Sequence, residues 1–108
     1  MKRLVVYIRS NFCPDVQRTR DFLERYQVPH HLIDADQDPA AKERVRMWTG
    51  YLSFPTLVVA EEDAIVPHEP PVPLLPGQSP RDVDRGTMLT EASTRTLESF
   101  LRRHGFLE

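Results

Sequence analysis

The sequence has a single cysteine, Cys13, among 108 residues, which excludes an internal disulfide and a cysteine-rich metal site. No apolar run approaches the roughly 18 residues of a membrane span, so we expect no association with a membrane. The apolar stretch after Met1 is too short for a secretory signal, and no small-residue cleavage site follows it. These absences lead us to expect a cytoplasmic protein.

Neither sign of charge dominates, because 14 basic and 16 acidic residues leave a net charge of −2. A nucleic-acid-binding surface needs an excess of lysine and arginine, so we expect no nucleic-acid partner. The hydrophobic share of 40% and the charged share of 28% are ordinary for a globular protein. A chain of this length fits one hydrophobic core, and we predict a single domain over residues 1–108 and a monomer.

The first 60 residues alternate between strand and helix patterns. Residues 3–8 and 31–34 are rich in strand-forming residues, and residues 56–60 give the clearest strand in the chain. Apolar residues recur at three- and four-residue steps over residues 15–26, which predicts a helix. A second helix begins with Asp38 and Pro39 and ends at Gly50, and this alternation predicts parallel strands joined by right-handed crossovers.

Proline dominates residues 66–80, which hold six of the ten prolines in the chain. Proline has no N–H and cannot continue a helix or a central strand, so we predict an irregular insertion over about residues 66–86. Its repeated P-x-x-P spacing also suits a polyproline II ligand. We favour a surface loop or a lid that folds over Cys13 and selects substrates.

The chain ends with one more strand and one more helix. The strand is predicted near residues 87–89, with residues 64–66 as the alternative. Ser93 or Thr94 caps the closing helix, and Gly105 ends it.

Cys13 is the candidate nucleophile. It stands directly before Pro14, a residue favoured at the first position of a helix, so Cys13 is predicted to be the N-cap. The N–H groups of Asp15 and Val16 and the helix dipole would favour a thiolate there. Arg9 would add a positive charge, whereas the carboxylate of Asp15 would repel the thiolate and compete for the same donors.

Two segments together resemble the glutaredoxin family. Residues 6–8 leading into Cys13-Pro14-Asp15-Val16 are similar to its active-site strand and C-P-x-C loop, and residues 53–56, Ser-Phe-Pro-Thr, resemble its T-V-P segment. The resemblance covers residues 3–60 well and 87–104 loosely. It implies an α/β, thioredoxin-like βαβ–ββα fold, with a mixed four-stranded sheet, three helices and, in this chain, a proline-rich insertion before the last strand.

The resemblance also implies thiol–disulfide exchange with glutathione or a similar small thiol, in service of redox homeostasis and without a tightly bound cofactor. Cys13 would attack mixed disulfides of proteins, and Phe54 would pair its backbone with the cysteinyl part of the bound thiol. Pro55 would be cis and keep a donor N–H out of the site. Arg9 would lie near a carboxylate of the ligand, and Ser93 would offer it N-terminal helix donors.

Two other functions stay open. Val16 stands where a second cysteine would resolve a mixed disulfide, which restricts the chemistry to one thiol, and the family's glycine pair before the last helix is absent. These departures favour the alternative of a glutaredoxin-fold binding module without turnover. An iron–sulfur cluster carrier is less favoured, because a lone thiolate would need a dimer and external thiols.

Two groups of residues are of types that bind metal ions, but neither group has the arrangement that a metal site needs. Asp34, Asp36 and Asp38 are spaced like the start of a calcium loop, but the next residue is proline where that loop needs glycine. His30 and His31 are predicted to point to opposite faces of a strand. We therefore expect no metal site.

Overall fold

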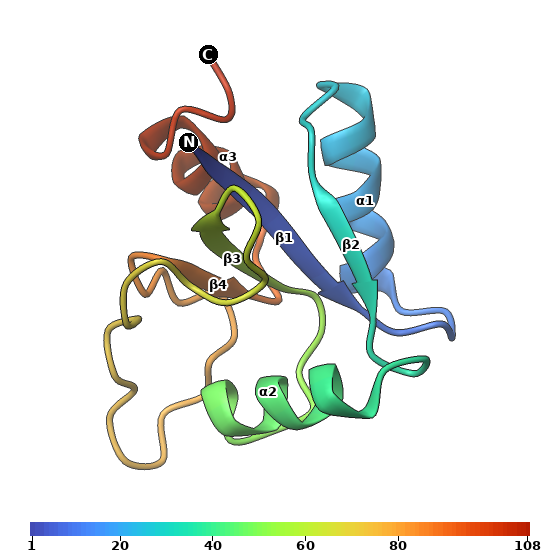
Figure 1. Cartoon of the computed structure of the whole chain (residues 1–108), viewed down its shortest axis with the longest axis vertical. Coiled ribbons are helices and arrows are strands. Elements are labelled where there is room, and N and C mark those ends of the chain that lie inside the picture. The colour runs from blue at the N-terminus through green and yellow to red at the C-terminus, as the bar shows by residue number, and fades with distance from the viewer.

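The computed structural model describes all 108 residues and shows a sheet with three helices (Figure 1). The elements follow the order β1 (Lys2–Ile8), α1 (Pro14–Arg25), β2 (His31–Asp34), α2 (Pro39–Thr49), β3 (Thr56–Glu61), β4 (Met88–Thr90) and α3 (Thr94–Arg103). This is the predicted βαβ–ββα order, and the sheet is mixed and four-stranded. The predicted fold class is confirmed.

The strands lie in the order β2-β1-β3-β4. β1 and β2 are parallel, as predicted, but β3 runs antiparallel to β1, so the expectation of parallel pairing was wrong for β3. Figure 1 shows the reason: α1 runs back along the sheet, whereas α2 lies across the end where β1 and β2 finish. The chain therefore re-enters the sheet at the same end of the strands from which it left, but on the other side of β1.

The helix boundaries follow local chemistry. Asp38 caps α2, since its side chain accepts hydrogen bonds from the N–H groups of the first turn, and Gly50 ends the helix with φ 79°. Ser93 caps α3 in the same way through the N–H of Thr96. Cys13 is the N-cap residue of α1, with Pro14 directly after it.

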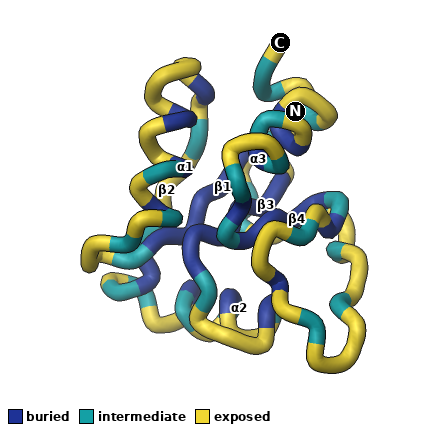
Figure 2. Tube along the Cα trace, turned by 180° about the vertical axis from the view of Figure 1, so that it is seen from behind, coloured by how far each residue is buried: buried dark blue, intermediate teal, exposed yellow.

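The core lies between the sheet and the helices. Figure 2 shows the central strands buried and the outer turns of the helices exposed. β1 and β3 supply most of the fully buried strand residues, and α1 and α3 pack against each other beside the sheet. None of the three helices combines the length and the apolar character that crossing a bilayer requires.

The proline-rich segment is irregular, as predicted, but it is not a lid over Cys13. Residues 73–78 line a groove with the end of α2, and no residue of the segment 66–80 lines the cavity at Cys13. Arg85 holds the segment in place: it is 6% exposed and donates to the carbonyls of Val72, at 2.8 Å, and Trp48, at 2.6 Å. The alternative strand at residues 64–66 was wrong, because these residues are irregular and form a bend after β3.

Candidate functional site

Cys13 lines a cavity of about 290 Å³ at the start of α1. The wall is formed by three parts of the chain that are distant in sequence: the turn after β1, the segment before β3 and the connection from β4 to α3. The lining residues are Arg9, Asn11, Phe12, Cys13, Pro14, Leu52, Phe54 and Glu91. Four of the predicted site residues, Arg9, Cys13, Pro14 and Phe54, are thus brought together.

The Cys13 side chain does not use the helix donors in the way predicted. It makes no capping hydrogen bond with an N–H of the first turn, although its carbonyl accepts from Gln17 at 2.9 Å. The side chain is instead partly buried and packs against the hydrophobic core. The thiol is thus held at the positive end of α1 without a direct partner among the N–H groups.

The segment before β3 presents unpaired backbone to this cavity. The peptide bond between Phe54 and Pro55 is cis, as the resemblance implied. Phe54 is only 4% exposed, yet neither its N–H nor its C=O takes part in a hydrogen bond within the chain. Buried backbone groups are almost always paired, so these two are available to a ligand.

Arg9 lies in the cavity wall, but its charge is already compensated. Its Nε is 3.3 Å from Oδ1 of Asp36, and its guanidinium lies over the Phe54 ring, 5.8 Å from the centroid. The hydrogen bond from the Ser10 N–H and the charges of Arg9 and Lys42 hold the pKa of Asp36 below its usual value. Asp36 therefore fixes the turn after β1 from the loop after β2.

The Asp15 carboxylate is bonded to arginine side chains and to none of the helix N–H donors, which corrects the expectation that it competes for them. It accepts hydrogen bonds from Arg18 and from two nitrogens of Arg81, at 2.7 and 3.2 Å. The bond from Arg81, together with that from Arg18, holds the pKa of Asp15 below its usual value. Two arginines thus neutralise the acid in the first turn of α1.

Glu91 supplies the only carboxylate that lines the Cys13 cavity. It follows β4 directly, and its φ of 47° lies in the left-handed region that favours glycine. Its N–H donates to the carbonyl of Pro55 at 2.9 Å, and its carboxylate is 3.3 Å from Arg81. Burial raises the pKa of Glu91, and Arg81 opposes this only in part.

Ser93 and Pro55 do not line the Cys13 cavity. Ser93 lines a neighbouring cavity of about 330 Å³, together with Arg18, Arg81, Asp82 and Glu91. Its hydroxyl caps α3 and its N–H donates to Asp82 at 2.8 Å. Pro55 is buried. Glu91 borders both cavities, so it separates the predicted Ser93 position from the thiol.

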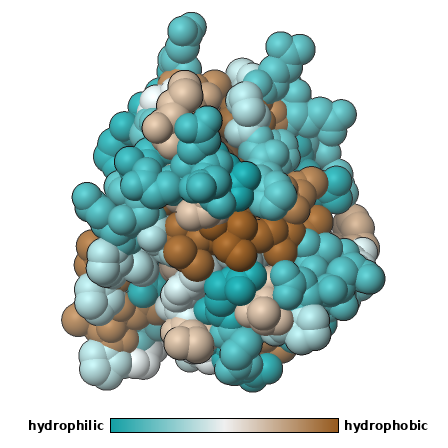
Figure 3. Space-filling model, in the orientation of Figure 1, coloured by the Kyte–Doolittle hydropathy of each residue, from teal (hydrophilic) through white to brown (hydrophobic).

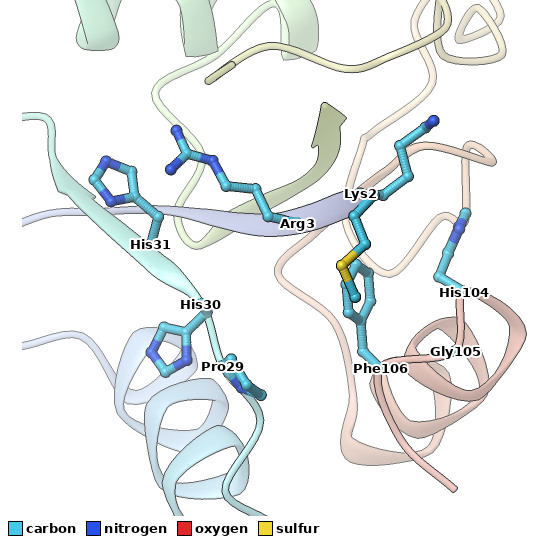
Figure 4. A pocket seen from close by; sticks show the side chains of 9 residues that line it. Lys2, Arg3, Pro29, His30, His31, His104, Gly105 and Phe106 are labelled. Carbon is cyan, nitrogen blue, oxygen red and sulfur yellow. The ribbon is translucent and has the colours of Figure 1, made fainter. Parts of the chain in front are cut away.

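The largest cavity, of about 690 Å³, contains no thiol. It lies at the other end of the sheet, between the start of β1, the start of β2 and the end of α3 (Figure 4). His30 and His31 point to opposite sides of β2 there, as predicted (Figure 4). No three potential metal ligands lie close together.

Neither Glu91 nor Arg81 is predicted as a site residue from the sequence. The absence of a glycine pair before α3 was a signal that another side chain enters the site, but the residue was not assigned. Nothing local marked Arg81, because its partner Asp15 lies 66 positions away.

The chain is similar to a known protein family. A family model described as Glutaredoxin matches residues 4–64, which is more than half of the chain. The match includes Cys13 and the Phe54–Pro55 segment and ends before the proline-rich segment. No curated protein and no solved structure matches significantly.

Proposed function

This chain belongs to the glutaredoxin family, and we propose that it is a thiol–disulfide oxidoreductase that works through one thiol, Cys13. The observation that carries the proposal is the position of this thiol. It lies at the N-terminus of α1, in a cavity that is also lined by Phe54, whose backbone is unpaired. A nucleophilic sulfur needs both features, since the helix terminus favours a thiolate and the backbone holds a peptide-like thiol against it.

The proposed reaction has two exchange steps. The Cys13 thiolate attacks the small-thiol sulfur of a mixed disulfide, and the protein thiolate leaves and takes a proton from water. A second small thiolate then attacks this sulfur of the new disulfide on Cys13, which releases Cys13 and forms the disulfide of the small thiol. Val16 replaces a resolving cysteine, so the second step needs an external thiol such as glutathione.

The surrounding residues have positioning roles in this proposal. Phe54 pairs its backbone with the bound thiol, and Pro55 keeps a donor N–H away from the reacting sulfurs. Pro14 starts α1 beside the thiol, and Arg9 faces a carboxylate of the ligand. Ser93 would hold a second carboxylate only in a ligand that reaches past Glu91 into the neighbouring cavity.

A reduction assay tests the proposal. The substrate is a peptide whose only cysteine carries glutathione in a disulfide, and free glutathione is the reductant. We expect turnover by the native protein and none by Cys13→Ser, because serine cannot form the mixed disulfide. Turnover that survives in Cys13→Ser would rule out the thiol mechanism.

The position of Glu91 supports a second candidate, a binding module without turnover. A carboxylate in the wall of the thiol cavity opposes thiolate formation electrostatically. Such a module would bind its partner equally well after Cys13→Ser, and it would show no turnover in the reduction assay.

A further inference from the structure

The unpaired backbone beside Cys13 extends past Phe54 toward α2. The N–H and C=O of Leu52 also take part in no hydrogen bond within the chain. Ser53 lies between these residues, and its carbonyl accepts only the hydroxyl of Thr56, at 2.8 Å. The Phe54 backbone pairs with the small thiol in the proposed reaction, so the Leu52 backbone is the part of this strip that is left for an extended peptide, as in β-strand addition.

A groove of about 440 Å³ is lined by Tyr51, the residue directly before this strip. It lies between the end of α2 and the proline-rich segment. Tyr51 lines this groove and Leu52 lines the Cys13 cavity. Tyr51 and Leu52 are consecutive, so the linings of the two depressions meet along the chain.

Large apolar side chains are exposed along this groove. Met47 on α2 is 76% exposed, Leu75 in the proline-rich segment is 71% exposed and Tyr51 between them is 54% exposed. Figure 3 shows apolar atoms at the lower left, where the proline-rich segment lies. An apolar group of this kind beside a reactive residue is typical of a protein-binding surface.

The groove is already present in the free protein. Arg85 connects the segment to α2 through its hydrogen bonds to Val72 and Trp48. The N–H of Val72 also donates to the carbonyl of Arg85, at 3.0 Å. A preformed groove loses little conformational entropy on binding.

We propose that the groove between α2 and the proline-rich segment binds an extended apolar stretch of a protein substrate, next to the disulfide that Cys13 attacks. This rests on the proposed function and narrows its substrate class. The occupant is a polypeptide because the lining of the groove meets the backbone strip at Cys13 along the chain. An extended chain advances about 3.3 Å per residue, so four residues beside the reacting cysteine span about 13 Å.

Two pairs of peptides test this substrate class. Each peptide has one cysteine in a disulfide with glutathione, followed or preceded by four residues that are either Leu-Val-Phe-Leu or Gly-Ser-Gly-Ser. In one of the two pairs, the apolar peptide should have a KM about tenfold below that of its Gly-Ser counterpart, because one or two apolar side chains become buried in the groove. Equal KM values within both pairs would overturn the proposal.

Surface variants locate the binding site. Met47→Glu and Leu75→Glu should each raise the KM of the apolar peptide about tenfold. Neither variant should change the kcat or the KM of the Gly-Ser peptide. Val72→Glu is the matched control, because Val72 is 61% exposed in the same segment but does not line the groove. An equal effect of all three variants would place the apolar stretch elsewhere and refute the groove.

A binding measurement keeps the groove testable if exchange fails. In the Cys13→Ser background, fluorescence anisotropy reports the binding of the labelled, reduced apolar peptides. Weaker binding after Leu75→Glu but not after Val72→Glu would support the groove, even if the loss of exchange ruled out the proposed function. Equal binding by both variants would overturn the groove independently of catalysis.

Discussion

Arg81 binds the carboxylate of Asp15 with two nitrogens, Nη1 at 2.7 Å and Nη2 at 3.2 Å. Asp15 lies in the first turn of α1, two residues after Cys13, and Arg81 directly follows the proline-rich residues 66–80. A segment outside the matched family region therefore controls the charge beside the thiol.

Removal of Arg81 should slow the reaction of Cys13. In Arg81→Ala the Asp15 carboxylate keeps only Arg18 as a partner, and its charge then opposes thiolate formation more strongly. We expect alkylation by iodoacetamide at pH 7 to slow about threefold, a change on the scale of one screened charge.

Two variants test whether the charge of Asp15 causes the slower alkylation. Asp15→Ala in the Arg81→Ala background should restore the rate, because it removes the uncompensated carboxylate. Arg20→Ala removes an exposed arginine without an ion pair on the same helix and should change little. An equal decrease in Arg20→Ala would show that net charge alone is responsible.

The ion pair between Asp15 and Arg81 should make the free energy of unfolding depend on pH. The pKa of Asp15 is lower in the folded protein than in the unfolded chain, so the folded state binds fewer protons. The stabilisation that ionised Asp15 gives to the fold is complete above about pH 4 and is lost as the pH falls through the lowered pKa. Urea unfolding at pH 7 and pH 3 should show Asp15→Asn costing about 0.5 kcal/mol more at pH 7, a small value because Arg81 is half exposed. A cost independent of pH would contradict the pairing.

Local sequence patterns predict the elements well. The pairs Cys13–Pro14 and Asp38–Pro39 mark the starts of α1 and α2, and both are found where predicted. Each signal depends on the chemistry of a single turn, so it can be recognised without knowledge of the rest of the chain. The family resemblance added the cis bond before Pro55, which no local pattern predicts.

The path of the proline-rich segment was not predictable in this way. Proline excludes helix and central strand but specifies no partner. The position of the segment depends on Arg85, whose acceptors belong to Trp48 and Val72, 37 and 13 positions away. The same holds for Arg81 at Asp15 and for Glu91 at the Cys13 cavity, since these contacts arise only once the chain has folded.

Arg85 should be essential for the groove and for stability. Its buried guanidinium donates from Nε to Val72 and from Nη1 to Trp48, and a lysine cannot supply both bonds from one plane. We expect Arg85→Lys to lower the free energy of unfolding by about 2 kcal/mol, as for a buried carbonyl left unpaired. Urea unfolding measures this loss.

Limited proteolysis provides a second readout for this variant. Cleavage within residues 66–80 should be at least tenfold faster in Arg85→Lys, because the segment is released from α2. Arg95→Lys is the control, since Arg95 is exposed on α3 and makes no ion pair. Unchanged cleavage would mean that the prolines alone hold the segment.

Glu91→Gln should make Cys13 more reactive and should change the pH dependence of stability. The substitution removes a carboxylate from the wall of the thiol cavity, so iodoacetamide alkylation at pH 7 should become about threefold faster.

Burial raises the pKa of Glu91 in the folded state, so the favourable contribution of this residue to stability is present below about pH 4 and is lost as the pH rises through the raised pKa. Glu91→Gln should therefore be relatively more stable at pH 7 than at pH 4 in urea unfolding. Glu24→Gln, an exposed change on α1, should alter neither measurement, and a Glu91→Gln protein with native reactivity would show that this carboxylate does not act on the thiol.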